Sequence, residues 1–403
     1  MVIRQRASGR TRVKRPSAGR RCCALLLLSL ALASACAGPA PSPTPTSSQP
    51  WIEEEVSFTF GPNELYGVLT LPTGEGPCPA IVIVSGSVST NTGVRAGASS
   101  AYHIDHARKM VLSGFAVLRY DPPGVGQSSG QAGFETLDLR TEEVAAALRY
   151  VQSRSDIRAQ HVGLHANSQG AWVIAMAAAR YPDEVAFIIP VSSSGVSVAE
   201  QQVYSIEAQS KAAYFAEDDV TTAVLFGRLL IDWQLVQPIY RDVNEADAQA
   251  LGGGPWTDFL ALVYEPGEIT PAEALQQGLD ILISIQDEPW AKYLYLQELY
   301  FPQLEGIPPD QVEALRAMVG PNLLNDPREY LTKVQCPVLA FFGENDLLQP
   351  TTKSAALYEQ YLGEAGNRDY QIVVIPDEGH SIGIWTPGYW EALSAWLERL
   401  SSE

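Results

Sequence analysis

The sequence predicts an α/β fold in which one helical insertion interrupts a mostly parallel, doubly wound sheet. Short apolar runs alternate with helical patterns over residues 80–191 and again over residues 338–400. Continuous Val, Ile and Leu runs are typical of parallel strands that helices cover on both faces. Residues 195–331 break this alternation, because they are acidic, helix-like and rich in aromatic residues.

Eight strands are expected, and the first two alternate polar with apolar residues as a hairpin does. The expected strands are residues 55–60, 65–72, 80–84, 115–120, 161–165, 185–191, 338–342 and 371–375. Residues 281–283 are a further candidate strand. Apolar residues at helical spacing predict helices over residues 103–112, 137–154, 171–180, 352–362 and 389–400.

The first 36 residues have the pattern of a signal peptide. Basic residues precede an apolar run over residues 24–35, which is shorter than the roughly 20 residues that a membrane span requires. Residues 35–37 fit ordinary cleavage, whereas residues 32–36 resemble a bacterial lipobox that would make Cys36 the lipidated first residue. We favour the lipid anchor, which places the protein on the outer side of a bacterial membrane; ordinary cleavage would release it as a secreted protein.

Residues 37–50 are rich in Pro, Ser and Thr and predict an extended tether. Eight of the 27 basic residues and none of the 46 acidic residues precede Cys36, so the remainder carries a formal net charge of −27. This charge argues against nucleic acid as a partner. Membrane contact is expected only through Cys36.

Residues 162–172 predict a nucleophile elbow. A short apolar strand leads into Ser168, and a helical pattern begins directly after it. The small residues Ala166 and Gly170, two positions before and after the serine, would let the strand and the helix approach closely. Ser168 is therefore the candidate nucleophile.

A serine nucleophile requires a base, and the five histidines leave one good choice. His103 and His106 fall on the first predicted helix, and His161 and His165 lie on the serine strand itself. His380 follows the last strand in a loop, where the carboxyl ends of parallel strands bring ligand-binding residues together. His380 is the predicted base.

The acid that orients the base is expected between the serine and the histidine in sequence. Residues 343–350 follow the seventh strand and contain Asp346, which we prefer, and Glu344, which is its rival. Residues 192–195, after the sixth strand, contain no carboxylate.

Two backbone amides are expected to stabilise the oxyanion. One is the Gln169 N–H, directly after the nucleophile. The other is the Ser87 N–H in the loop after the third strand, where Gly86 permits a close turn.

In this order and spacing, four segments make the sequence resemble the α/β-hydrolase fold, with the chain order Ser, Asp, His. They are residues 85–87, residues 120–128, the elbow around Ser168, and residues 343–350 with 379–380. The resemblance implies a helical cap, residues 195–331, inserted after the sixth strand of a core formed by residues 51–194 and 332–403. Ala166, Asn167 and Ser85 depart from the commoner family residues without removing a catalytic group. The first half resembles exported esterases and serine-aminopeptidase-like relatives more than dehalogenases or epoxide hydrolases, which carry aspartate at the elbow.

The family's strand order separates Cys78 and Cys336, although export would permit a disulfide. Each precedes a strand, and these strands would lie three places apart, or about 14 Å, too far for a bridge. We predict two free, buried thiols.

Other patterns predict no cofactor and no metal site. Residues 124–129 lack the third glycine of a dinucleotide fingerprint, because Ser129 stands in its place. His103 and His106 have no further metal ligands in evident spacing.

The sequence therefore predicts a serine hydrolase that cleaves a small-molecule or acyl ester through an acyl-enzyme. A peptidase or aminopeptidase using the same residues is the principal alternative. An acyl thioesterase and a non-catalytic binding lipoprotein are weaker alternatives.

Overall fold

A computed structural model describes residues 49–74, 76–87, 95–132, 135–235, 280, 282–294, 322 and 324–401, with the backbone alone at 229–235. The chain divides into the units Met1–Ser48 and Gln49–Glu403, and the described residues belong to the second. The predicted signal peptide, most of the tether, and residues 236–279 and 295–321 of the predicted cap lie outside them. None of the described helices is both long and apolar enough to span a bilayer.

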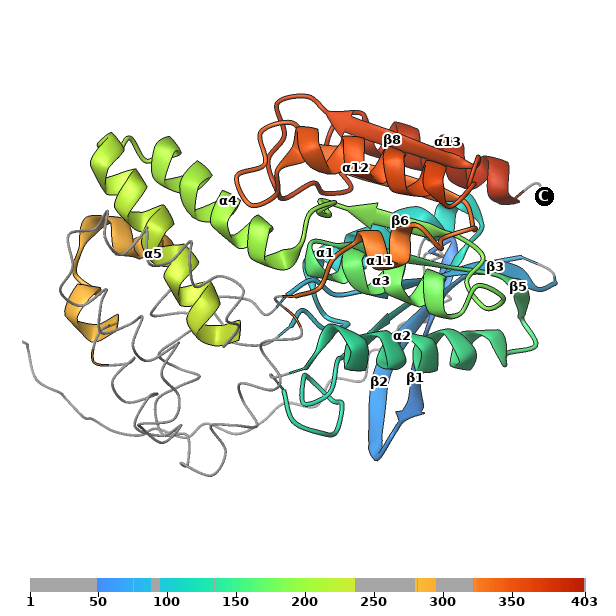
Figure 1. Ribbon diagram of the computed structural model, residues 1–403. Helices are drawn as coiled ribbons and strands as arrows, with labels where there is room; N and C mark the ends of the chain where they lie inside the picture. Colours follow the sequence, from blue (N-terminus) through green and yellow to red (C-terminus); the bar gives the residue numbers. More distant parts are fainter. Residues whose placement is uncertain are drawn as a thin grey trace, which may run out of the picture. The chain divides into compact units, whose positions relative to one another are not determined.

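The eight predicted strands form one sheet in the order β1-β2-β4-β3-β5-β6-β7-β8 (Figure 1). The β1–β2 hairpin is antiparallel, β2 is antiparallel to β4, and all other neighbours are parallel. The predicted fold class is therefore confirmed. The strands are β1 (Trp51–Phe60), β2 (Asn63–Pro72), β3 (Cys78–Val84), β4 (Ala116–Tyr120), β5 (Ile157–Asn167), β6 (Ile188–Val191), β7 (Val338–Gly343) and β8 (Tyr370–Ile375).

Helices cover both faces of the sheet because the central strands are continuously apolar, so that each strand presents apolar side chains to both faces. The five helices, in the positions predicted, are α1 (Ala101–Met110), α2 (Leu137–Gln152), α3 (Gln169–Arg180), α12 (Thr351–Glu364) and α13 (Tyr389–Ser401). A short 3-10 helix, η1 (Val111–Ser113), ends the first of them. Ala80, Val82 and Val84 of β3 belong to the core beneath α2, α3 and α12, whereas Ile81 and Ile83 belong to the core beneath α1 and α13.

Between β6 and β7 the described chain is helical. Its elements are α4 (Val198–Ala212), α5 (Glu217–Leu235), η3 (Pro289–Leu294) and α11 (Arg328–Leu331). The candidate strand at residues 281–283 is wrong, because residues 282–285 are helical. Leu282 and Ile285 are buried while Ile283 is 47% exposed, which is the burial spacing of a helix.

Cys78 and Cys336 are free thiols, as predicted. Cys78 begins β3 and Cys336 precedes β7, and β5 and β6 lie between these two strands. The prediction of full burial is corrected, since both residues lie at the amino ends of their strands and are only partly buried. Burial of the Cys336 thiol still raises its pKa to about 12.

Candidate active site

Ser168 occupies a strained turn between β5 and α3. Its φ angle is 53°, a left-handed conformation that is rare for residues other than glycine. The Ser168 N–H donates to the Val191 carbonyl of β6 at 2.9 Å, and the Ser168 carbonyl accepts from Ala171 N at 2.9 Å. These hydrogen bonds hold the turn, which joins a strand to a helix directly as an elbow does.

The small residues around Ser168 have a steric reason. A Cβ on Gly170 would lie 2.4 Å from the Ser85 carbonyl oxygen and 3.1 Å from the Ala166 Cβ. Ala166 is fully buried. Side chains larger than these would push α3 away from β5 and from the loop that follows β3.

The structure brings Ser168, His380 and Asp346 together. His380 Nε2 lies 2.9 Å from Ser168 Oγ, and His380 Nδ1 lies 2.8 Å from Asp346 Oδ2. The three residues follow β5, β8 and β7, so all lie at the carboxyl edge of the sheet. They are separated by up to 212 positions in sequence and meet only because the strands are parallel.

Asp346 and Glu344 have different surroundings. Asp346 is 2% exposed, and its Oδ1 accepts from Leu348 N at 2.7 Å and Gln349 N at 3.0 Å. Glu344 is exposed and accepts from Asp377 N at 3.0 Å. Of the two carboxylates weighed from the sequence, Asp346 is the one that contacts His380.

The loops that carry Asp346 and His380 pack directly on each other. Asn345 N donates to Glu378 O at 2.7 Å, and a Cβ on Gly343 would lie 2.1 Å from Gly379 O. Ser192, just after β6, donates from Oγ to the His380 carbonyl at 2.7 Å. Backbone contacts therefore hold the histidine at its position.

The loop after β3 passes beside Ser168. A Cβ on Gly86 would lie 3.5 Å from Ser168 Cβ, and the exposed Ser87 follows it. Gln169 is the first residue of α3. The residues predicted to supply the two oxyanion donors therefore flank the serine.

Three of the histidines that the sequence did not favour as the base lie away from Ser168. His165 is fully buried and its Nε2 is 2.9 Å from the Tyr389 hydroxyl. His103 and His106, also buried, place Nδ1 at 3.0 Å from Gly97 O and 2.7 Å from Tyr102 O. Burial lowers the pKa of both to about 4 and lowers the pKa of His165 well below its usual range.

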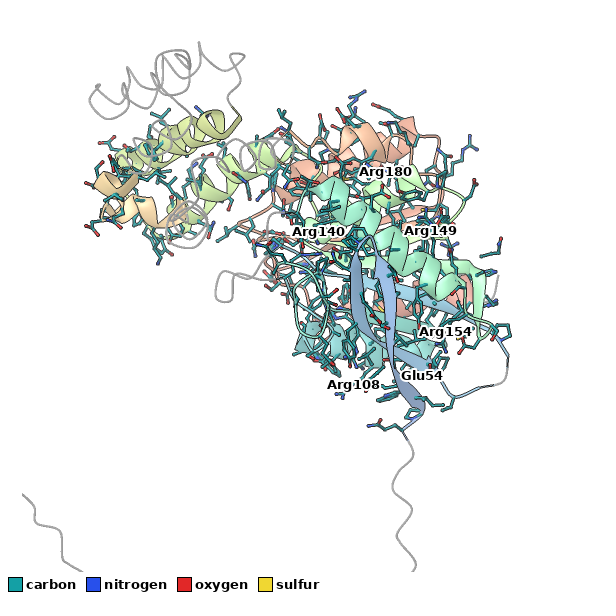
Figure 2. All side chains as sticks on the ribbon, turned by 90° about the horizontal axis from the view of Figure 1, so that it is seen from below. Glu54, Arg108, Arg140, Arg149, Arg154 and Arg180 are labelled. Atoms are coloured by element: carbon teal, nitrogen blue, oxygen red, sulfur yellow. The ribbon has the colours of Figure 1, made fainter. Side chains whose placement is uncertain are left out.

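Arg140, which links the loop after β3 (residues 85–87) to the elbow, was not identified from the sequence. It is one of the two α2 arginines labelled in Figure 2, and its side chain is 1% exposed. The guanidinium donates to the carbonyls of Ser85 and Gly86 and to Gln169 Oε1. The sequence does contain one indication that Arg140 is buried. It lies four residues before Val144, on the apolar face of the predicted helix.

Comparisons with known proteins agree with the fold. Residues 94–263 match the family model described as "Serine aminopeptidase, S33". The esterase PF2001 of Pyrococcus furiosus superposes with a TM-score of 0.50 at 11% identity, covering 89% of this chain and 96% of its own. The chain is a serine hydrolase of the α/β-hydrolase fold.

Two other similarities cover large parts of this α/β-hydrolase. The structure of DcsB in complex with its substrate analogue has a TM-score of 0.50 at 16% identity, covering 87% of this chain and all of DcsB. An uncharacterized 31.7 kDa protein of the traX-finO intergenic region of Escherichia coli is 21% identical over 254 residues, 63% of this chain and 70% of that protein. At these identities the structural similarities indicate the fold alone.

The turn after β4 in this α/β-hydrolase is held by a buried aspartate. Asp121 is 4% exposed and accepts from Ala98 N at 2.6 Å and Gln127 N at 3.0 Å. A Cβ on Gly126, where φ is 54°, would lie 2.1 Å from the Asp121 carboxylate. The aspartate and the glycine of this segment are therefore structural.

Proposed function

We propose that this α/β-hydrolase cleaves carboxylic esters through an acyl-enzyme intermediate. The observation that carries the proposal is the continuous hydrogen-bonded chain from Asp346 through His380 to Ser168. A serine hydroxyl is a weak nucleophile until an adjacent base takes its proton. These hydrogen bonds connect Ser168 to a base, His380, and connect that base to the carboxylate that orients it, Asp346.

In the proposed mechanism, His380 takes the Ser168 proton as Oγ attacks the ester carbonyl. An ionised carboxylate only accepts hydrogen bonds, so Asp346 holds the His380 Nδ1–H and leaves Nε2 free to accept. Asp346 then stabilises the imidazolium. His380 returns the proton to the departing alkoxide, which leaves the acyl group on Ser168.

The tetrahedral intermediate carries a negative charge on the former carbonyl oxygen. We assign the Ser87 and Gln169 backbone N–H groups as its donors, because their residues flank Ser168. Water then attacks the acyl-enzyme with His380 as base and releases the acid.

Cleavage of an ester requires fewer functional groups at this site than cleavage of a peptide at its free amino terminus. An aminopeptidase also requires a carboxylate to receive the amino group. In the loop after β7 (residues 344–350), Asp346 is buried and hydrogen bonded through both oxygens, so it does not supply that function. Glu344 is exposed and accepts from Asp377 N through one oxygen.

A serine peptidase is the second candidate function, because the matched family model is described as a serine aminopeptidase. The peptidase would use the same three residues. A carboxylate from the predicted cap, residues 195–331, would then receive the substrate's amino terminus. An acyl thioesterase and a non-catalytic lipoprotein are the remaining alternatives.

Fluorophosphonate labelling tests the enzyme proposal directly. Wild-type protein should be labelled at Ser168, and Ser168→Ala should take no label and lose hydrolysis by several orders of magnitude. Absence of label on folded wild-type protein contradicts every serine-enzyme assignment. Rates on p-nitrophenyl esters of increasing acyl length, compared with aminoacyl nitroanilides, then separate esterase from peptidase.

We also propose that the enzyme acts outside the cytoplasm, anchored by a lipid on Cys36. The support is the pattern of residues 1–50. Globomycin should cause the lipoprotein precursor to accumulate and should leave a conventionally cleaved form unaffected. A soluble, processed form in treated cells would contradict the anchor.

A further inference from the structure

A buried arginine lies directly behind the two backbone groups to which we assign the oxyanion. Arg140 of α2 donates from Nη2 to the carbonyls of Ser85 and Gly86, at 3.1 Å for Gly86, and from Nη1 to Gln169 Oε1. One side chain therefore contacts both residues that precede Ser87 and the residue that follows Ser168.

These contacts determine which way the backbone N–H groups of Gly86 and Ser87 face in the loop after β3, which we call the oxyanion loop (residues 85–87). In a trans peptide group, the carbonyl and the N–H point in opposite directions. The chain has no cis peptide in its described residues. Because Arg140 holds the Gly86 carbonyl, the Ser87 N–H of the same peptide group faces away from α2. The Ser85 carbonyl has the same relation to the Gly86 N–H.

Among the described residues, Arg140 forms no direct ion pair. The carboxylates that act on its charge, Glu143 and Glu135, are paired instead with its neighbour Arg95, at 2.6 and 3.1 Å. Arg140 is 1% exposed, and burying an unpaired charge is costly. Burial, followed by the charge of Arg95, lowers its pKa to about 9. A positive charge behind the donors would favour the negative charge that forms on the substrate oxygen.

We propose that Arg140 is a positioning residue for the oxyanion hole, orienting the Ser87 amide through the Gly86 carbonyl and securing Gln169 through its side chain. This inference rests on the proposed function. The guanidinium does not touch the substrate. It polarises the peptide groups that do, since hydrogen bonds in a chain strengthen one another.

Two substitutions separate the geometry from the charge. Arg140→Met removes both, and Arg140→Lys keeps a charge but replaces the planar fork with a single ammonium group. We expect kcat to fall on the order of 100-fold in Arg140→Met, the loss typical of one oxyanion donor. We expect roughly a tenfold loss in Arg140→Lys, with KM within about threefold of wild type in both variants, because the transition state is affected more than bound substrate.

The matched control is Arg149→Met on the same helix. Arg149 is labelled beside Arg140 in Figure 2, and its side chain is 53% exposed and paired with Glu184 at 2.8 Å. Its loss should leave kcat unchanged. All rates are measured per active site titrated with fluorophosphonate, so that loss of folded protein does not lower the apparent kcat.

The decisive readout is the inhibition constant of a trifluoromethyl ketone that matches the best ester. This inhibitor forms a charged tetrahedral adduct, so its affinity should fall in proportion to kcat/KM across the Arg140 variants. If kcat per titrated site and this affinity stay within twofold of wild type, Arg140 is only structural and the inference is overturned.

Gln169→Leu keeps the test decisive if the Arg140 variants do not fold. It removes only the side-chain acceptor of Arg140 on α3, and kcat should fall severalfold at constant KM. An unchanged kcat in this variant also overturns the inference. A wild-type protein that takes no label and cleaves no ester overturns the proposed function itself, whereas active wild type with fully active variants overturns the role of Arg140 alone.

Discussion

Three residues at the carboxyl edge of the sheet adopt positive φ angles although they are not glycines. They are Ser168, Ser192 and Asp377, at 53°, 50° and 61°. Such conformations cost on the order of 1–3 kcal/mol each and persist only where surrounding contacts require them. Here Ser168 N–H is bonded to β6, Ser192 Oγ holds the His380 carbonyl, and Asp377 N–H is bonded to Glu344. The strain is concentrated at the site.

At the residue scale, the acid assignment has a direct test. Asp346→Asn should lower kcat on the order of 10³- to 10⁴-fold, because an amide can favour the wrong His380 tautomer. Glu344→Gln, the matched control in the same loop, should stay within twofold of wild type because Glu344 is exposed and bonded to Asp377 N. Kinetics on the best p-nitrophenyl ester measures both, and a reversed ranking would make Glu344 the acid.

At the scale of elements, the sharp turn at Ser168 requires α3 to lie very close to β5 and to the loop after β3. Gly170 is the position where no side chain fits, since its Cβ would lie 2.4 Å from Ser85 O. The obstacle is a backbone atom of the loop that carries Gly86. Any movement that relieves the clash therefore also moves the proposed oxyanion donors.

Gly170→Ala should lower the free energy of unfolding by about 1–3 kcal/mol, the usual cost of overpacking. It should also lower kcat because it displaces the loop after β3. The control is Gly363→Ala in α12, where a Cβ would meet nothing within 4 Å. Alanine there should raise stability by up to about 1 kcal/mol through helix propensity. Urea denaturation compares the two, and equal stability of both variants would contradict the steric explanation.

Helix α4, which follows β6, contacts the loop that carries Asp346 (residues 344–350), here called the acid loop. Gln201 Nε2 donates to Leu348 O at 2.6 Å, and the Tyr204 hydroxyl donates to Asp346 O at 2.9 Å. The acid loop is thus held by the helix that follows β6 as well as by the loop that carries His380.

Tyr204→Phe should remove one hydrogen bond to the Asp346 backbone, worth about 1 kcal/mol, and lower kcat roughly fivefold if that energy positions the acid. Tyr214→Phe is the control, since Tyr214 is 95% exposed at the end of the same helical region. Steady-state kinetics and thermal unfolding are measured on both. An unchanged kcat for Tyr204→Phe would show that the Tyr204 hydroxyl does not position Asp346.

For the whole molecule, a group of buried histidines lies between α1 and β5. His103, His106 and His165 are at most 1% exposed, and the His106 and His165 rings are 4.9 Å apart. The Tyr102 hydroxyl, His106 Nε2 and His165 Nδ1 are buried without a hydrogen-bond partner among the described residues. Protonating these histidines would place positive charges in the core.

Stability should therefore fall as the pH decreases from about 6.5 to about 4. Burial lowers the pKa of His103 and His106 from 6.5 to about 4, so in this window the unfolded chain binds more protons than the folded chain. Each such histidine contributes up to about 1.4 kcal/mol of stability lost per pH unit. Above pH 6.5 this contribution is fully present.

His106→Leu should flatten this dependence, because it removes one buried proton acceptor at nearly constant volume. His161→Gln, at a partly exposed histidine of β5, is the matched control. Urea denaturation at half-unit intervals between pH 4 and pH 7 gives the slopes. If His106→Leu retains the wild-type slope, the acid sensitivity has another origin.

The sequence alone predicted the sheet, which the structure confirms, and proposed Ser168 as the nucleophile and His380 as the base. Each depends on a pattern within one stretch of chain, namely a β-branched run, a strand that meets a helix at Ser168, or a strand followed by His380. These patterns are local consequences of burial and of the backbone, so they are readable without the fold. Export and the lipid anchor at Cys36 remain predictions from a pattern of the same kind.

Only the tertiary structure showed that Asp346, and not Glu344, contacts His380, and only it revealed the contacts of Arg140. The two acids lie in one loop, which packs through Gly343 against Gly379 of the loop that carries His380. Arg140 reaches carbonyls 54 and 55 positions earlier in the chain, a contact that exists only because α2 packs against the elbow. Both outcomes depend on side chains brought together across the sheet edge, and sequence spacing contains no measure of that distance.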